Sequence, residues 1–285
     1  MSESQVKDLS ILSAKIRKET IKMLKWRKYG HLGGSLSIVE LLSVLYGKHL
    51  KHDPKNPQWE DRDYLVLSKG HAGPALYSAL AVRGFFDEEM LYTLNELGTN
   101  LPSHPDRLKT PGVDVTTGSL GQGTSFAAGL CHTFKMEGSD QMVYLICGDG
   151  ELNEGQCWEA FQFIASEKLN QVLVFIDKNN MQLDGRLEDV LNPYDISKKM
   201  EAFGFHVQTV TGCNEEEIDK AIENAKKMKD QAVCIILDTT KCQGVTHYYD
   251  RLDNHAPKFG EEETKILDGV IQDLEDYISK GEANV

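Results

Sequence analysis

Two apolar runs, VYLICGDG at residues 143–150 and VLVFIDKNN at residues 172–180, decide the fold of this 285-residue chain. Each begins with five uncharged apolar residues and then changes to glycine, aspartate or asparagine. A helical pattern at residues 154–168 lies between them. Continuous apolar strands that alternate with helices are typical of a parallel sheet covered on both faces. The sequence therefore predicts an α/β fold in which both runs are strands of one mostly parallel sheet, with helices on both faces.

The remaining sequence extends this alternation. A third apolar strand is predicted at residues 233–237, and an extended segment at residues 206–211. The apolar spacing predicts further helices at residues 4–28, 37–48, 72–83, 87–97, 122–136, 195–203, 214–229 and 261–280. Ser37 and Glu40 have the spacing of a capping box at the start of the second of these helices. We expect a single domain over residues 1–285, with a helical N-terminal portion and no linker.

The composition excludes several classes of protein. The chain has 31 lysines and arginines against 44 aspartates and glutamates, so its formal charge is −13 and nucleic acid is not an expected partner. No apolar run approaches the roughly 20 residues that span a bilayer, and the N-terminus lacks a signal-peptide pattern. The six cysteines include no CxxC pair, which argues against a disulfide framework or a zinc site. We expect a cytoplasmic protein that contacts no membrane.

Ligand-type side chains follow both of the strands that decide the fold. Asp149 lies in a Gly-Asp-Gly turn after the first strand, and Asn179 follows the second strand thirty positions later. This spacing suits one helix and one strand, so both side chains should reach the same edge of the sheet, where ligands of parallel sheets bind. Carboxylate and amide oxygens suit Mg²⁺, which also takes phosphate and water oxygens. A short GDG motif is by itself more often a plain turn, but the spacing favours a metal–phosphate site.

Six motifs in chain order resemble those of the N-terminal, diphosphate-binding half of transketolases. They are GHLGGS at 30–35, SKGHA at 68–72, SHPD at 103–106, TTGSLGQG at 116–123, GDGELNEG at 148–155, and NN at 179–180 followed by Asp184 and Gly185. The fourth motif lies in a Pro-, Gly- and Thr-rich stretch, residues 99–123, that is long for an idle loop. Two positions depart from the family pattern, namely Leu32, where proline is frequent, and the residues around His255.

The resemblance implies a site for thiamine diphosphate and Mg²⁺, for which Ca²⁺ or Mn²⁺ can substitute. In this sequence the implied metal ligands are the side chains of Asp149 and Asn179 and the carbonyl of Met181. The implied cofactor-binding residues are His71, Gly118, Leu120, Asp149, Gly150, Glu154, Asn179 and His255. Among these, Gly150 would offer a backbone N–H to the diphosphate, and Glu154 would lie at a subunit interface near the cofactor.

The resemblance also implies a catalytic set. His31, His71, His104 and His255 would line the channel above the reactive carbon of the cofactor and bind sugar hydroxyls, and Glu154 completes the set. Histidine suits this task because it exchanges protons near neutral pH.

The length limits what this chain does by itself. The enzymes that it resembles also need a pyrimidine-binding domain and a C-terminal domain, and 285 residues leave no room for either. We therefore predict the N-terminal subunit of a two-chain transketolase, assembled as two copies of each chain, which transfers a two-carbon ketol unit from a ketose to an aldose. Sugar phosphates are the expected substrates. Alternatives are a subunit of a deoxyxylulose phosphate synthase-like enzyme or of a 2-oxo acid dehydrogenase, and a non-catalytic cofactor-binding subunit.

Overall fold

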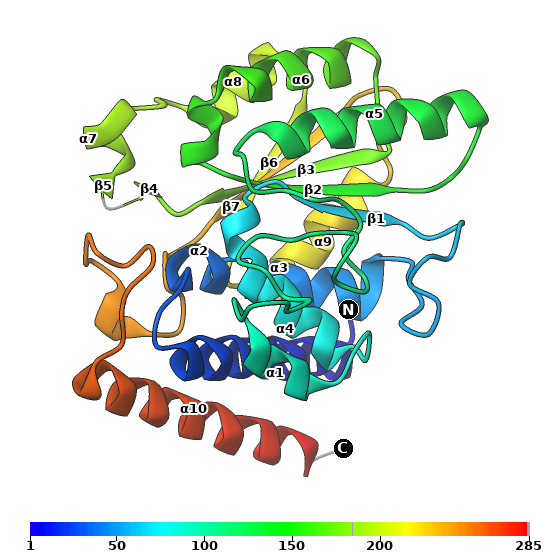
Figure 1. The fold of residues 1–285 in the computed structure, drawn as a ribbon. Helices are drawn as coiled ribbons and strands as arrows, with labels where there is room; N and C mark the ends of the chain where they lie inside the picture. The colour runs from blue at the N-terminus through cyan, green and yellow to red at the C-terminus, as the bar shows by residue number, and fades with distance from the viewer. Residues whose placement is uncertain (184, 284–285) are drawn as a thin grey trace.

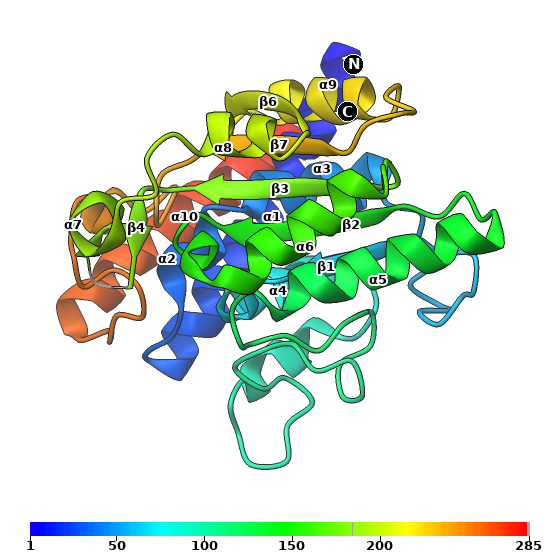
Figure 2. The same cartoon turned by 90° about the horizontal axis from the view of Figure 1, so that it is seen from above.

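A five-stranded parallel sheet forms the centre of the structure (Figures 1 and 2). The structure is a computed structural model and describes residues 1–183 and 185–283. Across the sheet the order is β1 (Tyr64–Leu67), β2 (Val143–Gly148), β3 (Val172–Lys178), β7 (Val233–Asp238) and β6 (His206–Thr211). The two strands that decide the fold are neighbours, and their register pairs Gly148 with Asp177. Their carboxyl ends therefore meet at one edge, as predicted.

Alternate residues of each strand enter two different cores. In β3, Val172, Val174 and Ile176 face one core, whereas Leu173 and Phe175 face the other. Helices α5 (Gln122–Glu137), α6 (Gly155–Ser166) and α8 (Ile196–Ala202) cover the first face (Figure 1). Helices α3 (Val39–Val44), α4 (Gly73–Val82) and α9 (Glu215–Ala225) cover the second. Burial on both faces explains why the strands read as continuous apolar runs.

Two long helices form an outer layer beyond the second face (Figure 1). Helix α1 (Glu3–Arg27) packs on α3, α4 and α10 (Glu261–Glu282), so the two ends of the chain share one layer. Ser2 and Gln5 form a capping box at the start of α1, and Lys28 ends it in the left-handed conformation. Among the described residues, no helix is long and apolar enough to cross a membrane. The six cysteines are free thiols, and only Cys213 is exposed.

The predicted helix over residues 37–48 is present from Val39 to His49, but its predicted capping box is wrong. This helix consists of α3 followed by a π-helix over Leu45–His49, and the short helix α2 (Leu32–Leu36) precedes it. Ile38 occupies the N-cap of α3 without a side-chain cap. The Ser37 hydroxyl donates to Asp177 at 2.7 Å, and Glu40 pairs with Arg17 at 2.7 Å. Both side chains of the expected box are therefore used in tertiary contacts.

Other differences concern short elements. The predicted helix at residues 87–97 is reduced to a 3₁₀ segment over Glu88–Thr93. Sequence reasoning did not assign β1, although its apolar run YLVL was a visible signal. It also did not assign the hairpin of β4 (Met181–Gln182) and β5 (Gly185–Arg186), or the helix α7 (Leu187–Leu191). The predicted motif residue Asp184 lies outside the described residues.

Candidate active site

A cavity of about 350 Å³ opens at the carboxyl ends of β2 and β3. It is lined by every residue that the sequence singled out for the site, namely His31, His71, His104, Gly118, Leu120, Asp149, Gly150, Glu154, Asn179, Met181 and His255. These residues come from six separate segments of the chain, when the loop 99–123 is counted as one segment. The structure therefore gathers the whole predicted set at the predicted edge of the sheet.

Two buried carboxylates, Asp149 and Asp177, lie at the ends of β2 and β3, and the first of them lines the cavity. Asp149 is 1% exposed, and its two oxygens accept N–H groups of Gly150 at 2.8 Å and Asn180 at 2.6 Å. Burial, and after it the negative charge of Asp177, raises the pKa of Asp149 to about 7. A positive charge at this point would stabilise the ionised form.

The donor set at this edge fits a divalent cation. Asp149 follows β2 and Asn179 follows the neighbouring strand β3, so both lie at the same edge of the sheet. Met181 is the first residue of the short strand β4. Asn179 Oδ1 accepts the Met181 N–H at 3.1 Å, so this turn is tightly held. Carboxylate, carboxamide and carbonyl oxygens are the hard ligands that Mg²⁺, Ca²⁺ and Mn²⁺ prefer.

Close backbone approach brings the loops around the cavity together. A Cβ atom on Gly34 would lie 2.8 Å from His71 Nε2, and one on Gly70 would lie 2.8 Å from the Gly118 nitrogen. The absence of a side chain at these glycines lets α2, the β1–α4 connection and the long loop 99–123 converge. Close packing of these segments therefore requires glycine at Gly34 in the GHLGG motif and at Gly70 in the SKGHA motif.

Four histidines form one cluster in the cavity. The ring centroid of His31 lies 5.7 Å from His71, 5.7 Å from His104 and 5.2 Å from His255, and His71 lies 5.0 Å from His255. The cluster joins the N-cap of α2, a 3₁₀ turn before α4, the long loop and the segment before α10. Residues that are 224 positions apart in the sequence thus share one wall of the site.

The environment keeps these imidazoles neutral. Burial and then His104 lower the pKa of His31 to about 4, and burial and then Lys241 lower that of His255 to about 3. Burial also lowers the pKa of His104, and burial together with Lys69 holds that of His71 well below its usual range. At neutral pH each ring therefore has one nitrogen that donates and one that accepts, which suits hydrogen bonding to hydroxyl groups.

Sequence reasoning missed several residues that line the same cavity. Glu151 is 2% exposed and accepts N–H groups of Gly121 at 2.7 Å and Gly148 at 3.0 Å, so it joins the start of α5 to the end of β2. Lys69 and Lys241 are buried cations, and Lys241 donates to the Leu183 carbonyl at 2.7 Å. Each lies in or beside a motif or a strand end, and that position was the signal available in the sequence.

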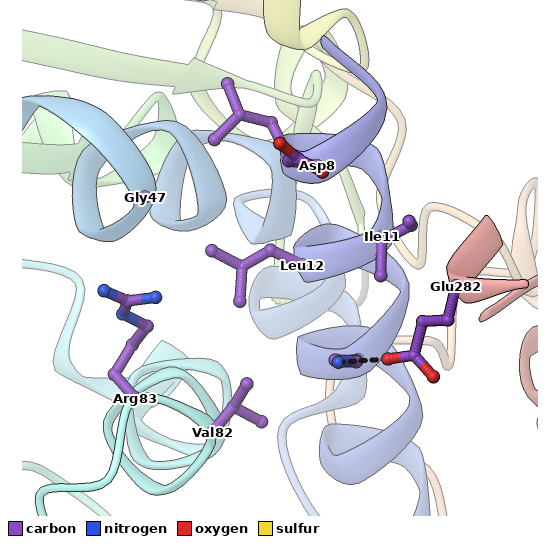
Figure 3. A pocket seen from close by; sticks show the side chains of 9 residues that line it. Asp8, Ile11, Leu12, Gly47, Val82, Arg83 and Glu282 are labelled. Carbon is purple, nitrogen blue, oxygen red and sulfur yellow. Dashed lines mark ion pairs between the residues drawn. The ribbon is translucent and has the colours of Figure 1, made fainter. Parts of the chain in front are cut away.

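A second cavity, of about 530 Å³, lies between α1, α4 and the π-helix (Figure 3). Leu9, Leu12 and Val82 line it, Arg83 projects at its side, and Lys15 pairs with Glu282 at 2.7 Å. None of the motif residues lines it. Its aliphatic side chains and one solvated ion pair do not indicate a class of ligand.

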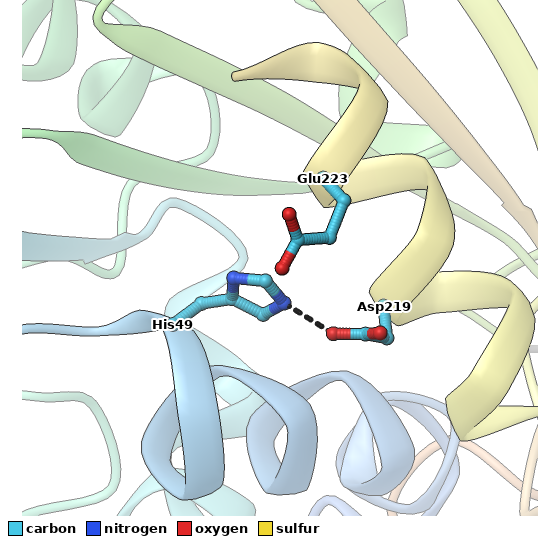
Figure 4. Close-up of side chains that lie close together, drawn as sticks. All are labelled: His49, Asp219 and Glu223. Carbon is cyan, nitrogen blue, oxygen red and sulfur yellow. Dashed lines mark hydrogen bonds and ion pairs between the residues drawn. The ribbon is translucent and has the colours of Figure 1, made fainter. Parts of the chain in front are cut away.

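A buried polar cluster joins the π-helix to α9 (Figure 4). His49 Nε2 lies 2.7 Å from Asp219, and Lys48 lies 2.6 Å from Asp219 and 3.2 Å from Glu223. Burial acts to raise the pKa of Asp219, but hydrogen bonds from Lys48 and His49 outweigh it and leave that pKa below its usual value. The Lys48 ammonium group already pairs with both carboxylates. The cluster is therefore a structural contact between the π-helix and α9 rather than a metal site.

Proteins similar to this chain are transketolases or their subunits. The family model described as transketolase, thiamine diphosphate binding domain, matches residues 10–270. The 6-deoxy-6-sulfo-D-fructose transketolase subunit SqwG of Clostridium sp. (strain MSTE9) is 46% identical over 263 residues, which are 92% of this chain and 95% of that protein. An apulose-4-phosphate transketolase subunit of Actinobacillus succinogenes is 38% identical over 239 residues, 83% of this chain and 86% of that protein.

Solved transketolases have the same fold. The transketolase of Campylobacter jejuni is 32% identical, and it superposes with a TM-score of 0.84 over 100% of this chain and 48% of that chain. The Leishmania mexicana enzyme gives the same TM-score over 46% of its own length. The chain thus spans about half the length of the solved transketolases that it matches. The predicted thiamine diphosphate-binding fold is confirmed.

Proposed function

Because the chain belongs to the transketolase family, as its N-terminal thiamine diphosphate-binding subunit, we propose that it works as one half of a two-chain transketolase. The reaction is the transfer of a two-carbon ketol unit from a ketose to an aldose. The observation that carries the proposal is the single cavity at the β2 and β3 ends, which is lined by all the predicted site residues. The alternative of a non-catalytic subunit is disfavoured by this complete set.

Asp149 and Asn179, with the Met181 carbonyl, would hold Mg²⁺, and Ca²⁺ or Mn²⁺ could replace it. Gly150 and the flanking backbone would bind the diphosphate, whereas Gly118 and Leu120 would pack against the rings. Thiamine diphosphate, when bound, supplies a nucleophilic carbon and an electron sink. The buried carboxylate of Asp149 explains why a cation is needed, since neither the chain, at −13, nor Asp149 attracts an anionic cofactor.

The four clustered histidines would bind the hydroxyl groups of the sugar and carry protons at their ring nitrogens. Their low pKa values keep them neutral, so each ring can accept a hydrogen bond from one hydroxyl and donate one to another. The ring centroids of His71 and His255 lie 5.0 Å apart, and these two side chains would also reach diphosphate oxygens. His31, at the centre of the cluster, would contact the reacting carbons of the sugar.

The remaining domains belong, in this proposal, to a separate partner chain. We place the pyrimidine-binding domain on that chain and expect two copies of each chain, in the cytoplasm. The nearly complete match to proteins named as subunits supports this arrangement. Glu154 is exposed at the rim of the cavity, where a partner subunit could meet the bound cofactor.

The test uses the chain alone and together with the partner chain. Ketol transfer should require both chains, Mg²⁺ and thiamine diphosphate. The donors to compare are pentose phosphates, 6-deoxy-6-sulfofructose and apulose 4-phosphate, since the last two are named for the relatives. Full transfer by the isolated chain would refute the two-chain arrangement, and a requirement for a lipoyl acceptor would favour a 2-oxo acid dehydrogenase.

A further inference from the structure

The carboxylate of Asp177, at the end of β3, is fully buried beside the proposed cation ligands and has no role in the function as proposed so far. Its Oδ2 accepts hydrogen bonds from Ser37 Oγ at 2.7 Å and from Asn179 Nδ2 at 2.9 Å. Its Oδ1 accepts one from Thr239 Oγ1. A buried carboxylate that accepts this many hydrogen bonds is held in one orientation.

Lys69 provides the counter-charge. Its side chain is 1% exposed, and its Nζ lies 2.6 Å from Asp177 Oδ2 and 2.6 Å from the Gly34 carbonyl. Burial of the carboxylate requires such a partner, because an unpaired buried charge is strongly destabilising. The pair also joins α2 and the β1–α4 connection, which carry His31 and His71, to the strand end that carries Asn179.

The contact between Asp177 and Asn179 decides which way the Asn179 carboxamide points. An ionised carboxylate only accepts hydrogen bonds, so only the NH₂ group of Asn179 can face it. The amide oxygen must then point away from Asp177, and it accepts the Met181 N–H at 3.1 Å. Because a carboxamide binds a cation through its oxygen alone, this orientation determines whether Asn179 can be a ligand.

We propose that Asp177, paired with Lys69, is a positioning residue that turns the oxygen of Asn179 toward the divalent cation. This inference rests on the proposed function, because it presumes that a cation binds at Asp149 and Asn179. Loss of a residue that orients a metal ligand typically costs about 10–100-fold in metal affinity. The loss should depend on the metal, since Mg²⁺ requires nearly ideal octahedral geometry whereas Ca²⁺ tolerates irregular sites.

The test compares Mg²⁺ with Ca²⁺. The variant Lys69→Met/Asp177→Leu removes the acceptor and its counter-charge together, so no unpaired charge stays buried. Binding of each metal to the full chain is measured by calorimetry at a fixed, saturating concentration of thiamine diphosphate. We expect the dissociation constant for Mg²⁺ to rise about 10–100-fold and that for Ca²⁺ to rise less than about threefold, because Ca²⁺ accepts a displaced ligand. If this variant does not fold, Lys69→Met/Asp177→Ser serves the same purpose, because a hydroxyl can donate or accept and does not fix the amide.

Two controls separate positioning from general damage. Lys69→Met/Asp177→Asn keeps an acceptor oxygen beside Asn179 and leaves no buried charge unpaired, so it should retain Mg²⁺ binding within about threefold. Lys178→Gln/Asp238→Asn removes the exposed ion pair, 3.2 Å long, that joins the ends of β3 and β7, and it should change neither constant.

The outcomes are distinct. Equal losses for both metals in the double variant, or an unchanged Mg²⁺ constant, would overturn the positioning role and leave the proposed function standing. Failure of the unaltered chain, with or without its partner chain, to bind either metal together with thiamine diphosphate would overturn the proposed function and the positioning role together.

Discussion

The two walls of the cavity are built in different ways. The cation edge consists of consecutive turns at the ends of β2 and β3, where the sheet register alone places Asp149 beside Asn179. The histidine wall is assembled from four segments that span residues 31 to 255, and it depends on packing of helices and loops. The first wall is therefore fixed by local geometry, and the second by the whole tertiary structure. Substitutions in the cation edge should therefore change cofactor binding, whereas substitutions in the histidine wall should change turnover.

The largest effect is expected for Asp149→Ala. Loss of the buried carboxylate removes a proposed cation ligand, so cation affinity should fall by more than the roughly 10–100-fold that loss of an orienting partner costs. Cofactor binding and ketol transfer should disappear with it. Calorimetry with Mg²⁺ and thiamine diphosphate measures this. Asp238→Ala changes an exposed aspartate at another strand end and should have no effect. Full cofactor affinity in Asp149→Ala would remove this residue from the site.

His31→Ala should affect the other wall. Loss of this proposed catalytic group should slow ketol transfer about 10²–10⁴-fold. Mg²⁺ and thiamine diphosphate should bind almost as before, because the ring of His31 packs on the other histidines rather than on the cation edge. Steady-state kinetics and calorimetry on one preparation test both statements. His206→Ala, on β6, is the matched control. An equal loss of cofactor affinity and rate would show that the two walls are not separable.

Glu151→Gln tests how the end of β2 is joined to the start of α5, where the long loop 99–123 ends. The two oxygens of Glu151 accept the Gly121 and Gly148 N–H groups, and a glutamine NH₂ must face one of these donors. A buried unsatisfied donor costs about 1–3 kcal/mol, so the free energy of unfolding should fall by that amount. Urea denaturation measures it, with Glu159→Gln on the exposed face of α6 as control. Unchanged stability would mean that the loop is held elsewhere.

The smallest effect concerns pH. The pKa of His31 is about 4 in the folded protein and 6.5 for an ordinary histidine, so unfolding takes up a proton between these values. The folded state therefore loses stability as pH falls from about 6.5 toward 4. His31→Asn should reduce proton uptake on unfolding near pH 5 by somewhat less than one proton. The slope of unfolding free energy against pH gives this number, and an unchanged slope would contradict the burial of the ring.

Much of the fold was predictable, because strand and helix periodicity is a local property. The strands at 143–147, 172–176 and 233–237 and the long helices at both ends follow the sequence pattern closely. The capping box of Ser37 failed because its hydroxyl bonds to Asp177, which is 140 positions away. Strand β1 was missed because four apolar residues are too short a run to separate from a loop.

The sequence by itself determined the alternation of strands and helices, and with it the position of Asp149 and Asn179 at one edge of the sheet. The tertiary structure alone decided that Lys69 pairs with Asp177, which way the Asn179 amide points and that His31 and His255 stay neutral. Periodicity acts over a few residues, whereas burial and ion pairing depend on distances between segments that the sequence separates widely.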